Sequence, residues 1–278
     1  MRAIAVHGEG EAATLDLGEA PRPPLRPGEV LARVVATSVN RPDVQQRRGL
    51  YPPPADASPI LGLDISGIVV GAADDVTWPR PGDRICALVN GGGYADYCAI
   101  PAGQCLPIPD GLGFVEAASL PEAFFTAWNA LINLGRLESG ENLLIQGGSS
   151  GVGLAAIQIA ARLRDASVIA TASSAEKRAL CTTVGAAHAL DYRDPDWDDQ
   201  VRHTLGGGCD VIVDAQAGPT TQRQLDLVAD GGRVVLLASH AGPVGEVNTR
   251  YIVRRQLTLV GGTLRPRSAA YKLSLIHI

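Results

Sequence analysis

The sequence predicts an α/β protein of two lobes, a compact strand-rich lobe followed by a lobe built on a doubly wound parallel sheet. Up to about residue 110, short apolar runs alternate with turns rich in proline and glycine, which favours a partly open barrel. From Asn142 onward, strand-like and helix-like segments alternate, which is typical of parallel βαβ units. With 278 residues and 46% hydrophobic content, the chain is long enough to build two cores.

The first lobe consists of strands separated by proline-rich loops. Residues 21–29 and 51–59 are predicted loops, because proline lacks the N–H donor that a sheet needs. Ser119 and Glu122 have the spacing of a capping box, with a proline inside the first turn, and predict a helix over 121–134 that links the lobes. Strands are predicted at 3–6, 30–37, 65–71, 83–89 and 94–100.

The second lobe alternates strands and helices along its whole length, so its strands are expected to lie parallel in one sheet. The strands are predicted at 143–147, 167–172, 187–192, 209–215, 233–238 and 257–264. The helices between them are predicted at 152–163, 175–185, 196–205 and 220–229.

Composition argues against several classes of function. The net charge of −5 disfavours a nucleic-acid-binding surface, which would need a basic face. The five cysteines are an odd number and form no CxxC pair, so neither disulfides nor a thiolate zinc site is expected. No signal peptide precedes Glu9, and the uncharged stretch 142–161 is too rich in glycine and polar residues for a membrane span. We therefore expect a cytoplasmic protein that holds no metal and binds no membrane.

A glycine-rich turn, GSSGVG at 148–153, lies between a predicted buried strand and an amphipathic helix. This is the context of a dinucleotide fingerprint, in which glycines let backbone amides approach a pyrophosphate at the positive end of the helix. The spacing is GxxGxG rather than GxGxxG, and a purely structural bend is the alternative. We predict that the phosphates contact Gly148, Ser149, Ser150, Gly151 and Val152.

The choice of cofactor depends on the end of the second strand of this lobe, where an acidic residue would hold the ribose hydroxyls of NAD. Ser173, Ser174 and Lys177 follow that strand, and no acid stands at its end. Hydroxyls and a lysine can bind a 2′-phosphate, which predicts NADPH. Lys177 is one of only two lysines in the chain. The alternative is a helix-capping serine followed by an exposed helical lysine.

With these residues placed, the chain resembles the zinc-independent quinone oxidoreductase family of the medium-chain dehydrogenase/reductase superfamily. Within that family it is most similar to the p53-inducible quinone oxidoreductase-like proteins. The resemblance covers nearly the whole chain up to Lys272, and the combination of stretches is more specific than any one motif. These stretches are NRPDVQQRRGLYPPP (40–54), ILGLDISGIV (60–69), GGGYADYCAIP (91–101), LPEAFFTAWNAL (120–131), QGGSSGVGLAAIQIA (146–160) and GGTLRPRSAAYK (261–272).

The resemblance implies three parts and NADPH bound in a cleft between the lobes. Residues 1–120 would form a GroES-like catalytic domain and residues 121–264 a Rossmann domain. Residues 265–272 would start the return of the chain to the catalytic domain.

The last six residues, LSLIHI at 273–278, can be encoded by CTG TCT CTT ATA CAC ATC, which looks like a transposase adapter used in sequencing libraries. We therefore expect an adapter-derived tail, with the natural chain continuing past Lys272. A genuine apolar C-terminus is the alternative.

The family's zinc-dependent relatives place zinc ligands where this chain has residues 40–43 and 63–64, and the chain carries neither ligand set. Catalysis must then rely on neutral donors aimed at the carbonyl oxygen that receives negative charge. By resemblance, Asn40 and Tyr51 supply these donors. The alternatives are a turn-capping role for Asn40 and an exposed loop position for Tyr51. Asp43 and Asp64 are expected to be structural acceptors.

Resemblance also implies four further cofactor contacts, Thr126, Tyr192, Ser239 and Arg265. Surface packing is the alternative for Tyr192 and Arg265. The strand at 257–264 is expected to pair with its copy in a second subunit and so form a homodimer.

The predicted function is NADPH-dependent, zinc-independent hydride transfer to quinones or related α,β-unsaturated carbonyls. One alternative is a medium-chain enoyl-thioester reductase, which shares this architecture. A basic patch for a carrier phosphate would favour that activity, and the sequence has no clustered one. Another is a non-catalytic NADPH-binding role, since some relatives are lens crystallins or bind RNA. A third is a truncated chain without activity.

Overall fold

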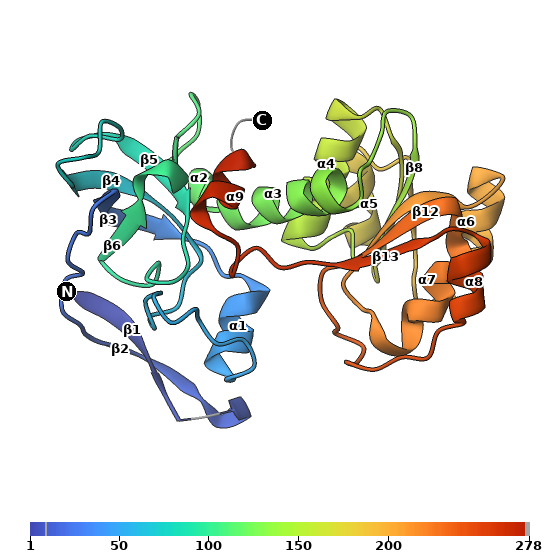
Figure 1. Cartoon of the computed structure of the whole chain (residues 1–278), viewed down its shortest axis with the longest axis horizontal. Helices are drawn as coiled ribbons and strands as arrows, with labels where there is room; N and C mark the ends of the chain where they lie inside the picture. The colour runs from blue at the N-terminus through green and yellow to red at the C-terminus, as the bar shows by residue number, and fades with distance from the viewer. Residues whose placement is uncertain (9, 276–278) are drawn as a thin grey trace. The chain divides into compact units, whose positions relative to one another are not determined.

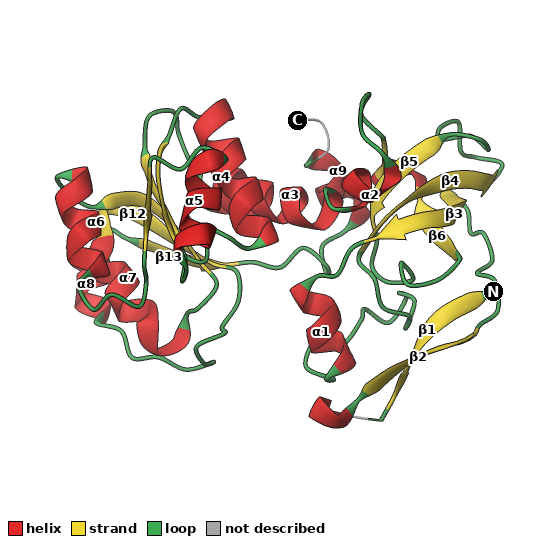
Figure 2. Ribbon diagram, turned by 180° about the vertical axis from the view of Figure 1, so that it is seen from behind, coloured by secondary structure: helices red, strands yellow, loops and turns green. Residues whose placement is uncertain are grey.

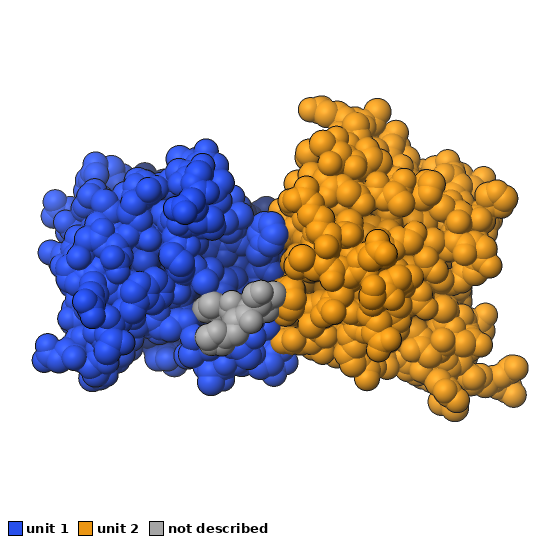
Figure 3. All heavy atoms as spheres, turned by 90° about the horizontal axis from the view of Figure 1, so that it is seen from above, with its two compact units in different colours: residues 1–125, 264–278 blue, residues 126–263 orange. Residues whose placement is uncertain are grey.

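The computed structural model describes residues 1–8 and 10–275. The chain divides into two compact units, which are coloured separately in Figure 3. One unit combines Met1–Phe125 with the residues from Leu264 onward, and the other is Thr126–Thr263. The domain boundaries expected from the sequence, after residues 120 and 264, stay a prediction. The change from the first unit to the second, between Phe125 and Thr126, lies inside the helix α3 (Pro121–Trp128).

The first unit is built on an antiparallel sheet of five strands in the order β6-β3-β4-β5-β7. A separate hairpin of two strands joins the unit through a bridge between Ala3 and Ala95. The hairpin strands are β1 (Arg2–His7) and β2 (Thr14–Glu19). The sheet strands are β3 (Glu29–Thr37), β4 (Asp64–Ala72), β5 (Arg84–Leu88), β6 (Tyr97–Pro101) and β7 (Cys105–Pro107).

The core of this unit is formed by the inward faces of its strands. The sequence patterns predicted five of these strands and missed two, β2 and β7. They also missed the helix α1 (Arg41–Arg47), which follows β3. The buried core side chains include Val30, Ile65, Val69, Ile85, Val89, Cys98 and Ile100. Two short 3₁₀ segments, η1 (Gly10–Ala12) and η2 (Ala102–Gln104), and the helix α2 (Phe114–Ala118) complete the part up to residue 118.

The predicted capping box at Ser119 is wrong. Ser119 ends α2, and its hydroxyl donates to the Glu116 carbonyl oxygen at 2.7 Å. The start of α3 is capped from elsewhere, because the backbone N–H of Glu122 donates to Oδ2 of Asp64 at 3.4 Å. The helical region nevertheless runs to residue 134 as predicted, since α3 continues as the π-helical segment η3 (Asn129–Leu134). A short sequence pattern cannot reveal a cap supplied by a distant strand.

The second unit is a parallel sheet of six strands in the order β10-β9-β8-β11-β12-β13. Counted along the chain this order is 3-2-1-4-5-6, that of a doubly wound dinucleotide-binding fold. The direction of winding reverses between β8 and β11, which places a topological switch point there. The strands are β8 (Asn142–Ile145), β9 (Ser167–Thr171), β10 (His188–Leu190), β11 (Cys209–Asp214), β12 (Val228–Leu236) and β13 (Thr258–Gly261).

Helices cover both faces of this sheet (Figures 1 and 2). One face carries α4 (Gly151–Leu163) and α5 (Ala175–Thr183). The other carries α6 (Trp197–Leu205), α7 (Thr221–Leu227) and α8 (Thr249–Arg254), with the 3₁₀ turn η4 (Gly218–Thr220) before α7. All predicted strands and helices of this unit are present, and α8 is an additional helix. Leu144, Ile169, Trp197, Val201, Ile212, Leu225 and Val234 are among the buried residues of its core.

The segment after residue 263 packs within the first unit. It contains the helix α9 (Ala269–Ser274), whose Lys272 is 1% exposed and donates from Nζ to Asn90 Oδ1 at 2.5 Å. Of the predicted adapter-derived tail 273–278, the first two residues belong to α9 and Leu275 is buried. Residues 276–278 lie outside the described residues, and the origin of the tail stays a prediction.

All five cysteines are buried and unpaired. Among the described residues, no helix is both long enough and apolar enough to cross a bilayer.

The turn into α4 depends on a close backbone approach at Gly153. A Cβ atom there would lie 2.6 Å from the carbonyl oxygens of Gly147 and Gly148. We expect Gly153→Ala to lower the free energy of unfolding by about 1–3 kcal/mol, because the turn must shift to admit the methyl group. Urea unfolding followed by circular dichroism measures this. Gly207→Ala is the matched control, since a Cβ at that glycine meets nothing within 4 Å, and equal stability of both variants would contradict the expectation.

Candidate functional site

The carboxyl ends of the parallel strands carry most of the predicted cofactor residues. In such sheets ligands bind beyond these ends, at the switch point. Here the glycine turn follows β8, next to that point. Gly147 has φ of 76°, a left-handed conformation that glycine adopts without strain. Gly148 is packed so closely that a Cβ would lie 2.6 Å from the Ala170 methyl group.

The turn leaves backbone donors pointing out of the start of α4. The hydroxyl of Ser150 caps the helix, accepting from the N–H of Gly153 at 3.0 Å and donating to the Gly147 carbonyl oxygen at 2.8 Å. Within the described part of the chain, the N–H groups of Gly151 and Val152 have no hydrogen-bond partner. Donors of this kind at a helix N-terminus suit an anionic phosphate.

Ser173, Ser174 and Lys177 lie between the end of β9 and the first turn of α5. Ser174 caps α5, and its Oγ accepts from the N–H of Lys177 at 3.2 Å. Ser173 is half-buried and the side chain of Lys177 is exposed. Tyr192, which follows the neighbouring strand β10, is 48% exposed. The helix-capping alternative therefore holds for Ser174, and Lys177 lies in the first turn of the helix that Ser174 caps.

Sequence reasoning missed three charged residues at this edge, Arg178, Asp191 and Arg193. Asp191 follows the third strand of this unit along the chain. The acid that would hold the ribose hydroxyls of NAD is expected after the second strand. The two arginines donate to its carboxylate at 2.8–3.0 Å and hold the pKa of Asp191 below its usual range. The pairing of β9 with β10 brings these residues to the same strand ends, a neighbourhood that spacing along the chain does not indicate.

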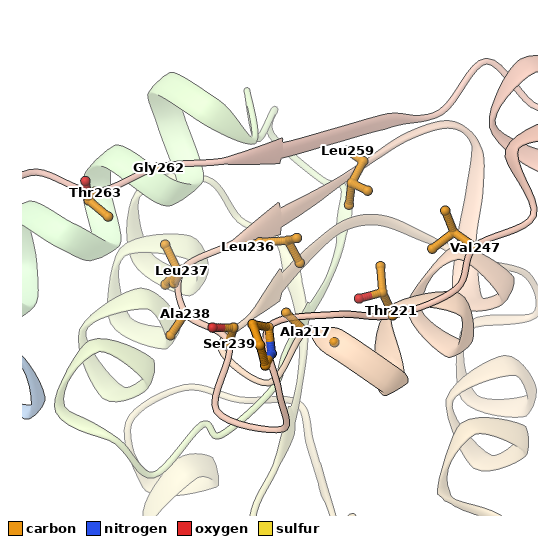
Figure 4. A pocket seen from close by; sticks show the side chains of 13 residues that line it. Ala217, Thr221, Leu236, Leu237, Ala238, Ser239, Val247, Leu259, Gly262 and Thr263 are labelled. Atoms are coloured by element: carbon orange, nitrogen blue, oxygen red, sulfur yellow. The ribbon is translucent and has the colours of Figure 1, made fainter. Parts of the chain in front are cut away.

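A pocket of about 410 Å³ lies at the carboxyl ends of β11, β12 and β13, on the other side of the switch point (Figure 4). It is mainly apolar, with three hydroxyl-bearing side chains, and it includes the predicted residue Ser239. Thr126 and the glycine turn are not part of its lining. The lining residues include Ala217, Thr221, Leu236, Leu237, Ser239, Val247, Leu259 and Thr263.

Two loops that close this pocket meet through their backbones. Asp214, buried at the end of β11, accepts from the N–H of Ala217 at 3.0 Å and fixes the first loop. A Cβ at Gly218 would lie 2.3 Å from the carbonyl oxygen of Gly242, and one at Gly245 would lie 1.9 Å from that of Gly218. Glycine is therefore required at positions 218 and 245, a requirement that no motif in the sequence indicates.

In the first unit, Asn40 belongs to a largely buried polar cluster. Its Nδ2 donates to Ser38 Oγ at 3.0 Å and to Asp64 Oδ1 at 3.3 Å, while its backbone N–H donates to Asp43 Oδ2 at 2.8 Å. Tyr94 also donates to Asp43, at 3.2 Å. Burial raises the pKa of both carboxyls, and the hydrogen bonds that they accept oppose this rise. Asp43 and Asp64 thus act as structural acceptors here.

Arg265, predicted as a cofactor contact, lies in the first unit and is 6% exposed. Its Nε and Nη2 donate to the Asn90 carbonyl oxygen at 3.1 and 2.6 Å. Its guanidinium carbon is 5.4 Å from the ring centre of Tyr51, the second predicted catalytic residue.

Desolvation raises the pKa of the half-buried Glu122 to about 8. Nearby carboxylates add to this rise, and the cations Lys272 and Arg265 oppose it.

Comparison with known proteins identifies the family. Residues 26–110 match the alcohol dehydrogenase GroES-like domain, and residues 151–276 match the family described as zinc-binding dehydrogenase. Quinone oxidoreductase of Mus musculus is 32% identical over 269 residues, which are 95% of this chain and 80% of that protein. The chain belongs to the quinone oxidoreductase family of the medium-chain dehydrogenases/reductases.

Two further relatives bear on cofactor and substrate. The quinone oxidoreductase of Thermus thermophilus, whose structures include a complex with NADPH, has a TM-score of 0.82 and 32% identity and covers 100% of this chain and 86% of that one. A phenolphthiocerol/phthiocerol polyketide synthase of Mycobacterium tuberculosis is 34% identical over 235 residues, which are 84% of this chain but 11% of that protein.

The residues of this quinone oxidoreductase family member do not fit the zinc that one family description implies. Asn40 and Asp64 lie in the two stretches where zinc ligands would be needed, and the Asn40 amide donates to the Asp64 carboxylate. Catalytic zinc prefers thiolate, imidazole and unencumbered carboxylate ligands. Among residues 1–8 and 10–275, no group of three or more His, Cys, Asp or Glu side chains is arranged to hold a metal ion.

The raised pKa of Glu122 makes the stability of the protein depend on pH. Because this pKa rises from 4.5 to about 8 on folding, the contribution of Glu122 to stability is full below the lower value and is lost as pH rises through the upper one. We expect Glu122→Gln to reduce the loss of unfolding free energy between pH 5 and pH 9 by on the order of 3 kcal/mol.

Urea unfolding at both pH values measures this difference. Glu138→Gln, at an exposed glutamate, is the control and should follow the unchanged protein. The same pH dependence in Glu122→Gln as in the unchanged protein would show that the carboxyl does not carry the effect.

Proposed function

We propose that this protein is an NADPH-dependent, zinc-independent reductase that transfers hydride to quinones or related α,β-unsaturated carbonyls. The observation that carries the proposal is the arrangement at the carboxyl edge of the parallel sheet. There the N–H groups of Gly151 and Val152, which have no partner among residues 1–8 and 10–275, lie at the start of α4, and Lys177 lies at the start of α5. The first set suits a pyrophosphate and the second a 2′-phosphate. The NADPH complex of the Thermus thermophilus relative supports this choice of cofactor.

NADPH supplies the hydride, and the protein supplies binding, orientation and donors. Ser149 and Ser150 complete the phosphate cradle, and Ser173, Ser174 and Tyr192 flank the 2′-phosphate. Thr126, Ser239 and Arg265 remain proposed contacts. The pocket that includes Ser239 has the size and apolar character of a small-molecule site.

For the acceptor, we propose that Asn40 and Tyr51 stabilise the negative charge that develops on its carbonyl oxygen. The amide of Asn40 already donates to Ser38 and Asp64, so contact with an acceptor requires it to exchange one of these partners. Tyr51 is half-buried and contributes a phenol group next to the Arg265 guanidinium.

A second candidate is reduction of an enoyl thioester. It is favoured by the 34% identity to a segment of a polyketide synthase, because polyketide assembly proceeds on acyl thioesters. Both reactions transfer hydride from the cofactor to an acceptor whose carbonyl oxygen gains negative charge, so the same cofactor site serves either. We also propose a cytoplasmic homodimer, in which β13, at the edge of its sheet, pairs with its copy.

Cofactor choice is tested first. We expect the protein to bind NADPH at least about tenfold more tightly than NADH, and Lys177→Ala to remove most of that preference, because a charge-assisted contact to the 2′-phosphate is lost. Fluorescence titration of the reduced nicotinamide gives both dissociation constants. Equal affinity of the unchanged protein for NADPH and NADH would contradict the proposed cofactor.

The acceptor is tested by steady-state kinetics at saturating NADPH. We expect a higher kcat/KM for 1,4-benzoquinone and 9,10-phenanthrenequinone than for crotonyl-CoA, because the sequence has no clustered basic patch for a carrier phosphate. Tyr51→Phe is expected to lower kcat about tenfold or more through loss of one donor to the oxyanion. A preference for crotonyl-CoA would instead establish the thioester reductase.

A further inference from the structure

Asp191, which follows β10, is held between two arginines. Its Oδ1 accepts hydrogen bonds from the backbone N–H and from Nε of Arg193, each at 3.0 Å. Its Oδ2 accepts from Nη2 of Arg193 at 2.8 Å and from Nη1 of Arg178 at 2.9 Å. One negative charge is thus paired with two positive charges, and the three side chains together remain cationic.

Arg193 also reaches from the end of β10 to the end of β9. Its Nη2 donates to the backbone carbonyl oxygen of Ser173, the residue at which the 2′-phosphate is expected. The side chain of Arg193 is 62% exposed, so it is held in place without being buried. None of the hydrogen bonds within residues 1–8 and 10–275 uses its Nη1, which leaves two N–H donors available.

The position of Asp191 explains why this acid does not favour NAD. An acid that accepts ribose hydroxyls needs carboxylate oxygens that are available as acceptors. Both oxygens of Asp191 are already occupied by guanidinium and backbone donors. Its role is to orient Arg193, whose planar guanidinium can then contact two phosphate oxygens with little loss of side-chain entropy.

We propose that Arg193 determines the cofactor specificity of this protein by binding the 2′-phosphate of NADPH. The proposal rests on the proposed NADPH-dependent function and adds a residue to it. Lys177 then supplies an exposed point charge, and Arg193 supplies a pre-oriented donor.

The test compares Arg193→Ala with the unchanged protein by fluorescence titration. We expect the Kd for NADPH to rise roughly tenfold, as for loss of one charged hydrogen-bonding group, while the Kd for NADH stays within about twofold. Competition with adenosine 2′-monophosphate should weaken in parallel, and competition with adenosine 5′-monophosphate should not. The Kd of Arg193→Lys for NADPH should lie between those of the unchanged protein and Arg193→Ala, because lysine keeps the charge but lacks the planar guanidinium.

Arg202→Ala is the matched control, since Arg202 is a partly exposed arginine of the same unit that is paired with Asp199 at 2.6 Å. If Arg193→Ala weakens NADPH binding no more than this control, or weakens NADH binding equally, Arg193 does not read the phosphate. If the unchanged protein does not distinguish the two cofactors, the proposed function fails and this inference fails with it. A preference that is lost in Lys177→Ala but kept in Arg193→Ala would overturn the inference alone.

Discussion

The carboxyl ends of six parallel strands lie along one edge of a single sheet, and the candidate site is built along that edge. Each strand end delivers one loop to it. The loop after β8 brings backbone donors, those after β9 and β10 bring cations and hydroxyls, and those after β11 and β12 enclose the apolar pocket. A parallel arrangement thus assembles a phosphate-binding half and an apolar half from loops that are each too short to form a site alone.

The alternation of strands and helices let the sequence predict the second unit almost completely, because the period of the apolar residues reflects which face each element buries. Local chemistry was also readable, as with the helix-capping alternative that the sequence left open for Ser174. What the sequence did not reveal are contacts between distant residues. The Asp64 cap of α3 depends on the contact of that helix with β4, and the clustering of Arg193 with Ser173 depends on the pairing of β9 with β10. A local pattern contains neither.

In the polar cluster of the first unit, carboxylates serve as structural hydrogen-bond acceptors. Asp43 and Asp64 are almost fully buried, and each is held by three or more hydrogen bonds from surrounding N–H and O–H groups. Buried charges are tolerated only where such donors surround them. These two carboxylates hold the loop that carries Asn40. The orientation of the Asn40 side chain is therefore set before any substrate binds.

The first unit is discontinuous in the chain, since Arg265 and Lys272 return to Asn90 after the whole second unit has intervened. During synthesis the ribosome must therefore complete the second unit before the first can finish folding. Until then the backbone carbonyl and side-chain amide of Asn90 lack their cationic partners. The order of folding is thereby expected to reverse the order of translation, with the later half of the chain reaching its final structure first.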